Sequence, residues 1–276
     1  GGHAHCGMMI YLSDNWPVNY RGNVFTLNLH GRRINRDTLH RRGAGYVAKH
    51  AADHLKSKDP WFRGIELGQG PDGGVFVLDW SDIGECHDND GIHRASGRIY
   101  KITHGQVRLY SRDLAKLSSL GLAKLQSSPN EWLIRQSRQL LQARAATGRK
   151  DITEAREILH TTYKLTSSAP TALRAMWALH VTGGLEEKWL LEQTHDEREH
   201  IRMWAIKLLN DNGAPTKTAL RRFVKLAQSD TAGLVQLELA STLQRLPHAQ
   251  RWELATALVS QGKFAIDPVL PLMIWY

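Results

Sequence analysis

Cysteine is almost absent from this sequence: its 276 residues include two, Cys6 and Cys86. Two cysteines exclude the disulfide-dense scaffolds of small secreted domains, and their spacing matches no zinc motif. They could still form one disulfide in an exported protein, remain free thiols or bind a metal. Long apolar runs are also lacking, since none approaches the roughly 20 residues of a membrane-spanning helix.

The positive charge is not concentrated in one stripe. The formal net charge of +9 is shared between the two parts of the chain, which argues against a nucleic-acid-binding surface. Five arginines cluster near the N-terminus, and the solvent-exposed face of a hairpin explains them more simply than phosphate binding does. They are Arg32, Arg33, Arg36, Arg41 and Arg42.

The first part of the chain has the pattern of β-strands. Pro71, Asp72, Gly73 and Gly74 predict a tight turn, because proline presets φ and glycine accepts a positive φ. Alternating or β-branched segments predict strands at 8–12, 23–29, 32–39, 45–50, 62–67, 75–80 and 98–103. Four antiparallel strands per unit, with a new unit near Trp61, predict about two blades of a β-propeller over residues 1–108.

Two blades cannot close a propeller, so we expect the chain to be a fragment. Gly1 is not a start residue, and residues 268–276 end inside an apolar run.

From residue 109 to residue 276 the apolar period changes to that of helices. A branched residue followed by a polar one opens an apolar stripe at Ile134, Leu173, Ile201 and Val235. This recurrence predicts stacked helix pairs of the HEAT or armadillo type. Four tryptophans are expected to fill the stacked core, with carbohydrate or partner contact as the alternative. They are Trp132, Trp177, Trp204 and Trp252.

The loop between the last two predicted strands is long and polar. Its side chains include Asp79, Asp82, Glu85, Cys86, His87, Asp88, Asp90 and His93. Long ordered loops are often functional, although a solvated acidic loop explains the same composition. His3 and His5 flank the first cysteine, so a metal site could form if the loops converge; surface histidines are the simpler interpretation.

Several segments resemble one protein family. GGHAHCGMMIYLSDNWPVNYRGNVFTLNLHGRRINRD, DPWFRGIELGQGPDGGVFVLDWSD, CHDND and SGRIYKI resemble the membrane-bound dehydrogenase-like proteins of planctomycetes and their relatives. NEWLIRQSRQLLQARAATG, LRAMWALHVTGGL, IRMWAIKLLND and DPVLPLMIWY extend the resemblance over nearly the whole chain. The family implies a propeller of the glucose and sorbosone dehydrogenase type, HEAT-like helices and a cytochrome c domain with a CxxCH haem motif.

The resemblance also implies roles for particular residues. Arg63 stands where quinone-dependent sugar dehydrogenases contact pyrroloquinoline quinone, and a guanidinium suits quinone carboxylates or carbonyls. The second arginine of that pattern is replaced here by Ile65. Asp79, Asp82 and His87 are the further cofactor-binding candidates, with calcium as a possible companion ion.

The histidines near the N-terminus are the catalytic candidates. His3 and His5 could line the same mouth and take a substrate proton as hydride leaves, although the family's general base belongs to an earlier blade. Neither cysteine has another three residues away, so any haem c would lie in a domain outside this chain.

The sequence therefore predicts part of an exported, periplasmic or cell-surface oxidoreductase that oxidises a sugar or polyol and passes electrons to a cytochrome c. Two alternatives remain open. One is a non-catalytic scaffold that binds carbohydrate or protein, because fold alone does not establish catalysis. The other is a purely structural role, in which the helices dock a cytochrome or another subunit.

Overall fold

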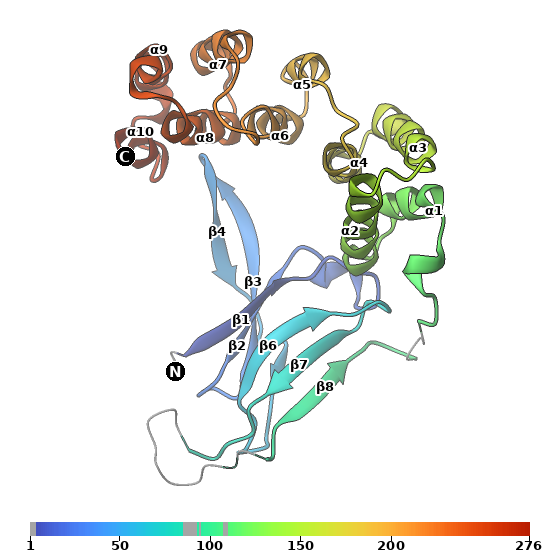
Figure 1. Cartoon of the computed structure of the whole chain (residues 1–276). Helices are drawn as coiled ribbons and strands as arrows, with labels where there is room; N and C mark the ends of the chain where they lie inside the picture. The colour runs from blue at the N-terminus through green and yellow to red at the C-terminus, as the bar shows by residue number, and fades with distance from the viewer. Residues whose placement is uncertain (1–3, 85–92, 94, 107–109) are drawn as a thin grey trace. The chain divides into compact units, whose positions relative to one another are not determined.

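The computed structural model describes residues 4–84, 93, 95–106 and 110–276 (Figure 1). Its contacts divide the chain into two compact units. The sheet unit comprises Gly1–His40, Val47–Leu114 and Ser128–Gln136, and the helical unit comprises Arg41–Tyr46, Ala115–Ser127 and Ser137–Tyr276. Strands thus precede helices, which confirms the predicted change of structure along the chain.

The first sheet is antiparallel and follows the order of the sequence, β1-β2-β3-β4, with the short β5 paired to β3. Its strands are β1 (His5–Ile10), β2 (Val24–Asn28), β3 (Arg33–Arg42), β4 (Gly45–His50) and β5 (Leu55–Lys56). A bulge between Cys6 and Met8 interrupts the pairing of β1 with β2. Gly7 occupies this bulge with φ +53°, and a Cβ there would come within 2.8 Å of the β6 backbone. Only glycine therefore suits this position.

The second sheet contains β6 (Gly64–Gln69), β7 (Val75–Asp79) and β8 (Arg98–Ile102) in that order. The predicted turn joins β6 to β7. Gly70 and Gly74 form a backbone hydrogen bond of 2.8 Å, Asp72 accepts the Gly74 amide, and Gly73 has φ +79°. The turn residues thus have the conformations that their chemistry favours.

The core of the sheet unit lies between the two sheets. Phe25, Leu27 and Ile34 of the first sheet and Val75 and Val77 of the second are at most 1% exposed. Burying five such side chains stabilises this unit by roughly 1.5–3 kcal/mol each before entropy is counted.

Aromatic rings extend this core at one end. Trp16 stacks on Tyr11 at 4.6 Å and on His54 at 4.3 Å. The Tyr11 hydroxyl donates to the Gly73 carbonyl and accepts the amide of Trp16. The segment after β1 is thereby fixed to the β6–β7 turn.

The helical unit consists of α-helices joined by short turns and 3-10 segments. The α-helices described are α1 (Ser119–Lys124), α2 (Glu131–Ala146), α3 (Ile152–Leu165), α4 (Ala169–Val181), α5 (Glu187–Gln193), α6 (Glu199–Leu209), α7 (Lys217–Ser229), α8 (Gly233–Thr242), α9 (His248–Val259) and α10 (Leu270–Trp275). The 3-10 segments are η1 (Val18–Tyr20), η2 (Leu114–Lys116), η3 (Leu125–Ser127), η4 (Leu243–Arg245) and η5 (Gly262–Phe264). Of these elements, η1, Leu114 of η2 and residues 131–136 of α2 belong to the sheet unit. Within the parts of the chain that the structure describes, none of the helices has both the length and the apolar character that a membrane crossing requires.

Helices of this unit stack in two rows. α4 contacts α6, α6 contacts α8 and α8 contacts α10, while α7 contacts α9 (Figure 1). The recurring sequence pattern falls on the first row: Leu173, Ile201 and Val235 start the apolar stripes of α4, α6 and α8 and are buried. The period of the pattern therefore corresponds to one inner and one outer helix, since these inner helices are separated in sequence by an outer one.

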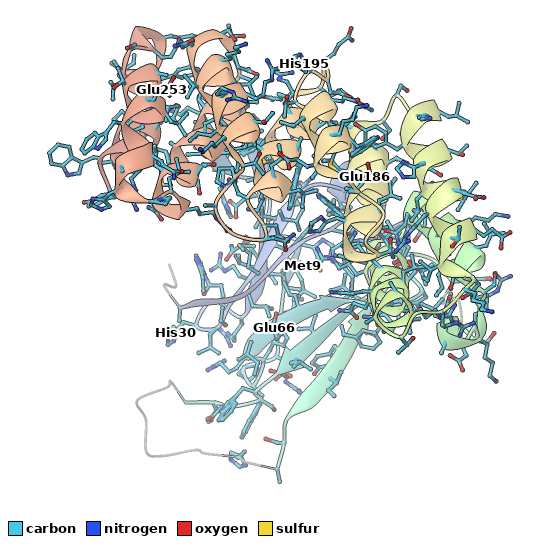
Figure 2. The ribbon with its side chains drawn as sticks, turned by 45° about the horizontal axis from the view of Figure 1, so that its top comes forward. Met9, His30, Glu66, Glu186, His195 and Glu253 are labelled. Atoms are coloured by element: carbon cyan, nitrogen blue, oxygen red, sulfur yellow. The ribbon has the colours of Figure 1, made fainter. Side chains whose placement is uncertain are left out.

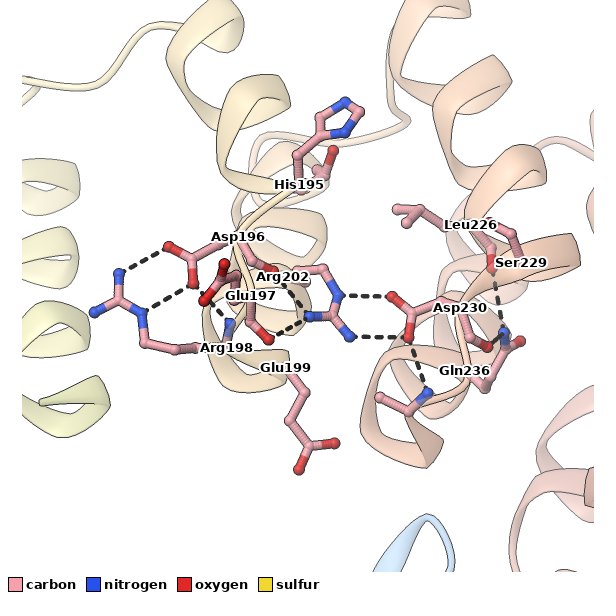
Figure 3. A network of polar contacts seen from close by, with 12 residues as sticks. His195, Asp196, Glu197, Arg198, Glu199, Arg202, Leu226, Ser229, Asp230 and Gln236 are labelled. Carbon is pink, nitrogen blue, oxygen red and sulfur yellow. Dashed lines mark hydrogen bonds and ion pairs between the residues drawn. The ribbon is translucent and has the colours of Figure 1, made fainter. Parts of the chain in front are cut away.

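A ladder of polar contacts joins neighbouring inner helices (Figure 3). Arg202 of α6 makes two hydrogen bonds, of 2.7 and 3.0 Å, to the carboxylate of Asp230, which precedes α8. Asp230 also accepts the amide of Ala232, and Gln236 donates to the Asp230 carbonyl. Asp196 precedes α6 as Asp230 precedes α8. Its carboxylate likewise accepts two hydrogen bonds from an arginine, here Arg198.

The tip of the β3–β4 hairpin, Arg41–Tyr46, belongs to the helical unit. Ala44 is completely buried, and its amide donates to Asp267 at 2.8 Å. Gly233 opens α8 against this tip, where a Cβ would meet the Ala44 backbone at 2.8 Å. Arg41 pairs with Glu199 at 3.3 Å, so this arginine is not simply part of a solvated face.

The four tryptophans differ from the expected common core. Trp132, Trp177 and Trp204 are partly buried, and Trp177 meets Trp204 edge to face at 4.8 Å, with Arg138 over the Trp177 ring. Trp252 is 71% exposed, so the prediction is wrong for this residue.

Candidate functional site

The polar residues at the end of β7 form one connected cluster. Asp79 is buried, and its Oδ2 atom accepts a hydrogen bond of 2.7 Å from Nε of Arg98, its cross-strand partner on β8. Nη2 of Arg98 forms an ion pair with the same oxygen, also at 2.7 Å. Asp59 binds the same guanidinium at 2.6 Å. Although burial lowers the pKa of Arg98, its bonds to Asp59 and Asp79 raise it overall. The amide of Trp61 and then Arg98 lower the pKa of Asp59, which favours its ionised form beside the guanidinium.

Arg63 precedes β6 and is directed into the loop that follows β7. It is 8% exposed, and its guanidinium donates to the carbonyls of Pro60, Phe62, Ile83 and Gly84 at 2.8–3.3 Å. All three guanidinium nitrogens are used in these bonds. The arginine therefore braces two backbone segments, and four of its five N–H donors are used within the loop.

Asp79 and Asp82 complete the same loop. The Oδ1 atom of Asp79 accepts the amides of Arg63 and Ser81 at 2.7 and 3.1 Å. Asp82 accepts the amide of Gly84 at 3.2 Å, and Ser81 adopts φ +56°. Short polar side chains stabilise such turns by accepting nearby amides. The three residues expected at a cofactor are thus brought together, but their contacts are those of loop construction.

Sequence reasoning missed Arg98 and Asp59, which give this cluster its charge balance. The only signal was the arginine at the start of the strand that follows the polar loop. Recognising its partner requires the register between β7 and β8, in which Asp79 stands opposite Arg98.

Of the catalytic and thiol candidates, the structure describes His5 and Cys6. His5 is exposed on β1, with Nε2 3.0 Å from the Asn28 side-chain amide. The Cys6 thiol donates to the Gly64 carbonyl at 3.4 Å, and burial, then Glu66 (Figure 2), raise its pKa. A raised pKa disfavours the reactive thiolate. His3, His87 and Cys86 lie outside the described residues, so their predicted roles, including the Cys6–Cys86 disulfide, stay predictions.

Among the residues that the structure describes, no three His, Cys, Asp or Glu side chains converge in a way that would hold a metal ion.

Two cavities lie in the sheet unit. One, of about 310 Å³, is lined in part by Lys56, Asp59, Tyr100 and Lys101 between β5 and β8. Its lysines are paired with aspartates, which limits their use for a ligand. The other, of about 330 Å³, lies where β1 and β6 meet the first residues of α2, and Met9 and Leu67 line it.

A further cavity belongs to the helical unit. It has a volume of about 580 Å³ and is mostly apolar, with exposed Trp252 and Trp275 among its lining residues.

A family model described as a domain of unknown function, DUF7133, matches residues 3–106. No curated protein and no solved structure matches the chain. The matched residues include every strand of the two sheets, β1 to β8. Both cavities of the sheet unit draw most of their lining from this matched region, whereas the helices of the helical unit lie outside the match.

Proposed function

We propose that this chain forms two neighbouring blades of a β-propeller and a HEAT-like helical array in an exported dehydrogenase-like protein. That protein would oxidise a sugar or polyol and pass electrons to a cytochrome c domain or subunit. The family resemblance of the sequence supports this proposal, and two adjoining antiparallel sheets followed by stacked helix pairs are compatible with it.

One observation carries the architectural part of the proposal: the second sheet has exposed apolar side chains on its outer face, beside Glu66 and Lys101. Val75 and Val77 fill the core, whereas Phe76, Leu78 and Ile99 on the other face are 37%, 39% and 72% exposed. A sheet that faces water on one side normally alternates apolar and polar residues, and a group of exposed apolar side chains on the second face favours a further layer. In a propeller, that layer is the next blade.

The residues present do not fit the predicted quinone contact. The nitrogens of Arg63 are occupied by backbone carbonyls, and both carboxylate oxygens of Asp79 by Arg63, Ser81 and Arg98. The same saturation leaves Asp79 unsuited to calcium. If pyrroloquinoline quinone and calcium serve this protein, other residues hold them. Arg63 and Asp79 would then shape the loop beside that site.

The test uses the full-length protein that contains this chain, supplied with pyrroloquinoline quinone, calcium and a panel of sugars and polyols. Reduction of an artificial electron-acceptor dye by at least one substrate is the expected result. A folded protein that reduces no dye with any substrate would contradict the catalytic proposal. Replacing Ile99 by lysine should prevent assembly of the complete sheet array, and an unchanged fold in that variant would contradict the blade assignment.

The saturation of Arg63 and Asp79 also favours a second candidate function, a non-catalytic scaffold for carbohydrate or protein. If this is the function, the full-length protein should bind a glycan or a protein without reducing the dye under the same conditions. Binding and turnover measured on one sample therefore separate the two functions.

A further inference from the structure

The cavity between β1, β6 and the start of α2 combines apolar and ionic side chains within the sheet unit. Its volume, about 330 Å³, lies in the range of small-molecule sites. Met9 and Leu67, which are 6% and 5% exposed, form its apolar lining together with Met8. Glu131, Trp132 and Arg135 of α2 contribute its ionic and aromatic groups.

The walls of this cavity are held by hydrogen bonds that do not involve a ligand. The Gln69 side chain donates to the Ile10 carbonyl at 3.1 Å and accepts the Leu12 amide at 2.8 Å, so it bridges β6 to β1. Asn130 caps the first turn of α2 by accepting the Trp132 amide, and it donates to the Pro71 carbonyl at 3.0 Å. The Glu131 amide donates to the Leu12 carbonyl at 3.3 Å. A preformed site reduces the entropy lost on binding.

The two side chains of the ion pair at the cavity differ in their exposure to solvent. The Glu131 side chain is 7% exposed and accepts a hydrogen bond of 3.2 Å from Nε of Arg135, whose side chain is 62% exposed. The two terminal nitrogens of Arg135 have no partner among the described residues. One edge of the guanidinium is thus fixed by a buried carboxylate, and the outer donors remain available to an anion.

The aromatic component lies one residue from Glu131. Trp132 is partly buried and meets Tyr110 edge to face at 6.2 Å, which restrains the indole. Indole rings combine a large apolar area with an N–H donor, and this combination suits ligands that have one apolar face and several polar groups. A guanidinium beside such a ring adds a preference for carboxylate.

We propose that this cavity binds a sugar that carries a carboxylate, such as a uronic acid. The sugar ring would pack against Trp132 and Met8, and its carboxylate would accept hydrogen bonds from the terminal nitrogens of Arg135. A neutral sugar would make the first contact and not the second. This binding site is separate from the Arg63 loop and does not depend on the proposed dehydrogenase activity.

The test is isothermal titration calorimetry of the chain with D-glucuronate and, as the neutral comparison, D-glucose. We expect glucuronate to bind about fivefold more tightly, because the partly exposed guanidinium contributes modestly, and salt should reduce this preference. Arg135→Gln should lower glucuronate affinity to that of glucose. Trp132→Ala should lower the affinity for each sugar by at least the same factor as Arg135→Gln lowers that for glucuronate.

Matched controls separate the site from general surface effects. Arg221→Gln removes an exposed arginine of α7, and Trp252→Ala removes an exposed tryptophan of α9; neither lines the cavity, so both should bind as the parent does. Circular dichroism with thermal melting checks that Arg135→Gln and Trp132→Ala remain folded. No heat with either sugar at tens of millimolar, equal affinity for both sugars, or a folded Trp132→Ala variant with unchanged affinity would overturn the proposal.

Discussion

Replacing Arg63 by methionine should destabilise the sheet unit strongly, because this side chain braces the segments on both sides of a loop. Its four bonds reach Pro60 and Phe62 before β6 and Ile83 and Gly84 after β7. Methionine keeps an unbranched apolar stem and has no donors. The substitution therefore removes all four bonds together with the end of the side chain.

The expected loss is about 3–5 kcal/mol of unfolding free energy. Hydrogen bonds from a charged donor contribute about 1.5–3 kcal/mol each, and acceptors left buried cost about 1–3 kcal/mol each. Four bonds would exceed our estimate if they were additive, but the loop carbonyls can regain water once the arginine is gone. Lysine retains the charge and reaches fewer carbonyls, so Arg63→Lys should lose about half as much.

Urea unfolding followed by tryptophan fluorescence measures the loss, and amide hydrogen exchange at residues 60–64 and 79–84 locates it. Arg221→Met is the matched control, since Arg221 is exposed on α7 and should change stability by less than about 0.5 kcal/mol. An Arg63→Met variant as stable as the parent that no longer binds pyrroloquinoline quinone would refute this reasoning. It would identify Arg63 as a cofactor contact instead.

Three further predictions concern other parts of the chain. Burial lowers the pKa of His54, so the stability that its neutral form provides is present above about pH 6.5 and falls as pH drops below it; urea unfolding between pH 5 and 8 should show this slope, and a slope unchanged in His54→Phe would contradict the assignment. Asp230→Asn should cost about 2–4 kcal/mol, because Arg202 then keeps a buried charge without its counterion; thermal melting with a double-mutant cycle to Arg202→Met tests the coupling, and additive losses would argue against it. Trp252→Ser should leave stability within about 0.5 kcal/mol of the parent, since the ring is 71% exposed; a loss above about 2 kcal/mol by the same melting assay would mean that Trp252 belongs to a core after all.

Local sequence patterns predicted most of the secondary structure. Strand 45–50 has the predicted limits, and β7 ends at Asp79, one residue before the predicted end. The turn at Pro71–Gly74 has the expected glycine conformation. These features depend on side-chain alternation and on backbone preferences of proline and glycine, which act between residues close in the chain. The inner helices were identified for the same reason.

The roles of the polar residues could not be predicted in this way. Arg63 was a cofactor candidate because the family resemblance places it where quinone-dependent dehydrogenases contact their cofactor, but a guanidinium on a long side chain can point to a ligand or into its own loop. Only the folded chain shows which acceptors surround it. The Asp79–Arg98 pair likewise depends on strand register.

The sequence by itself determined where strands end and helices begin, because the period of apolar residues follows directly from backbone geometry. Tertiary structure decided which polar side chains are bonded within the fold and which keep donors for another molecule. Arg63 satisfies backbone carbonyls, whereas Arg135 retains open donors at a cavity. That difference arises from contacts between segments far apart in the chain, which no local pattern specifies.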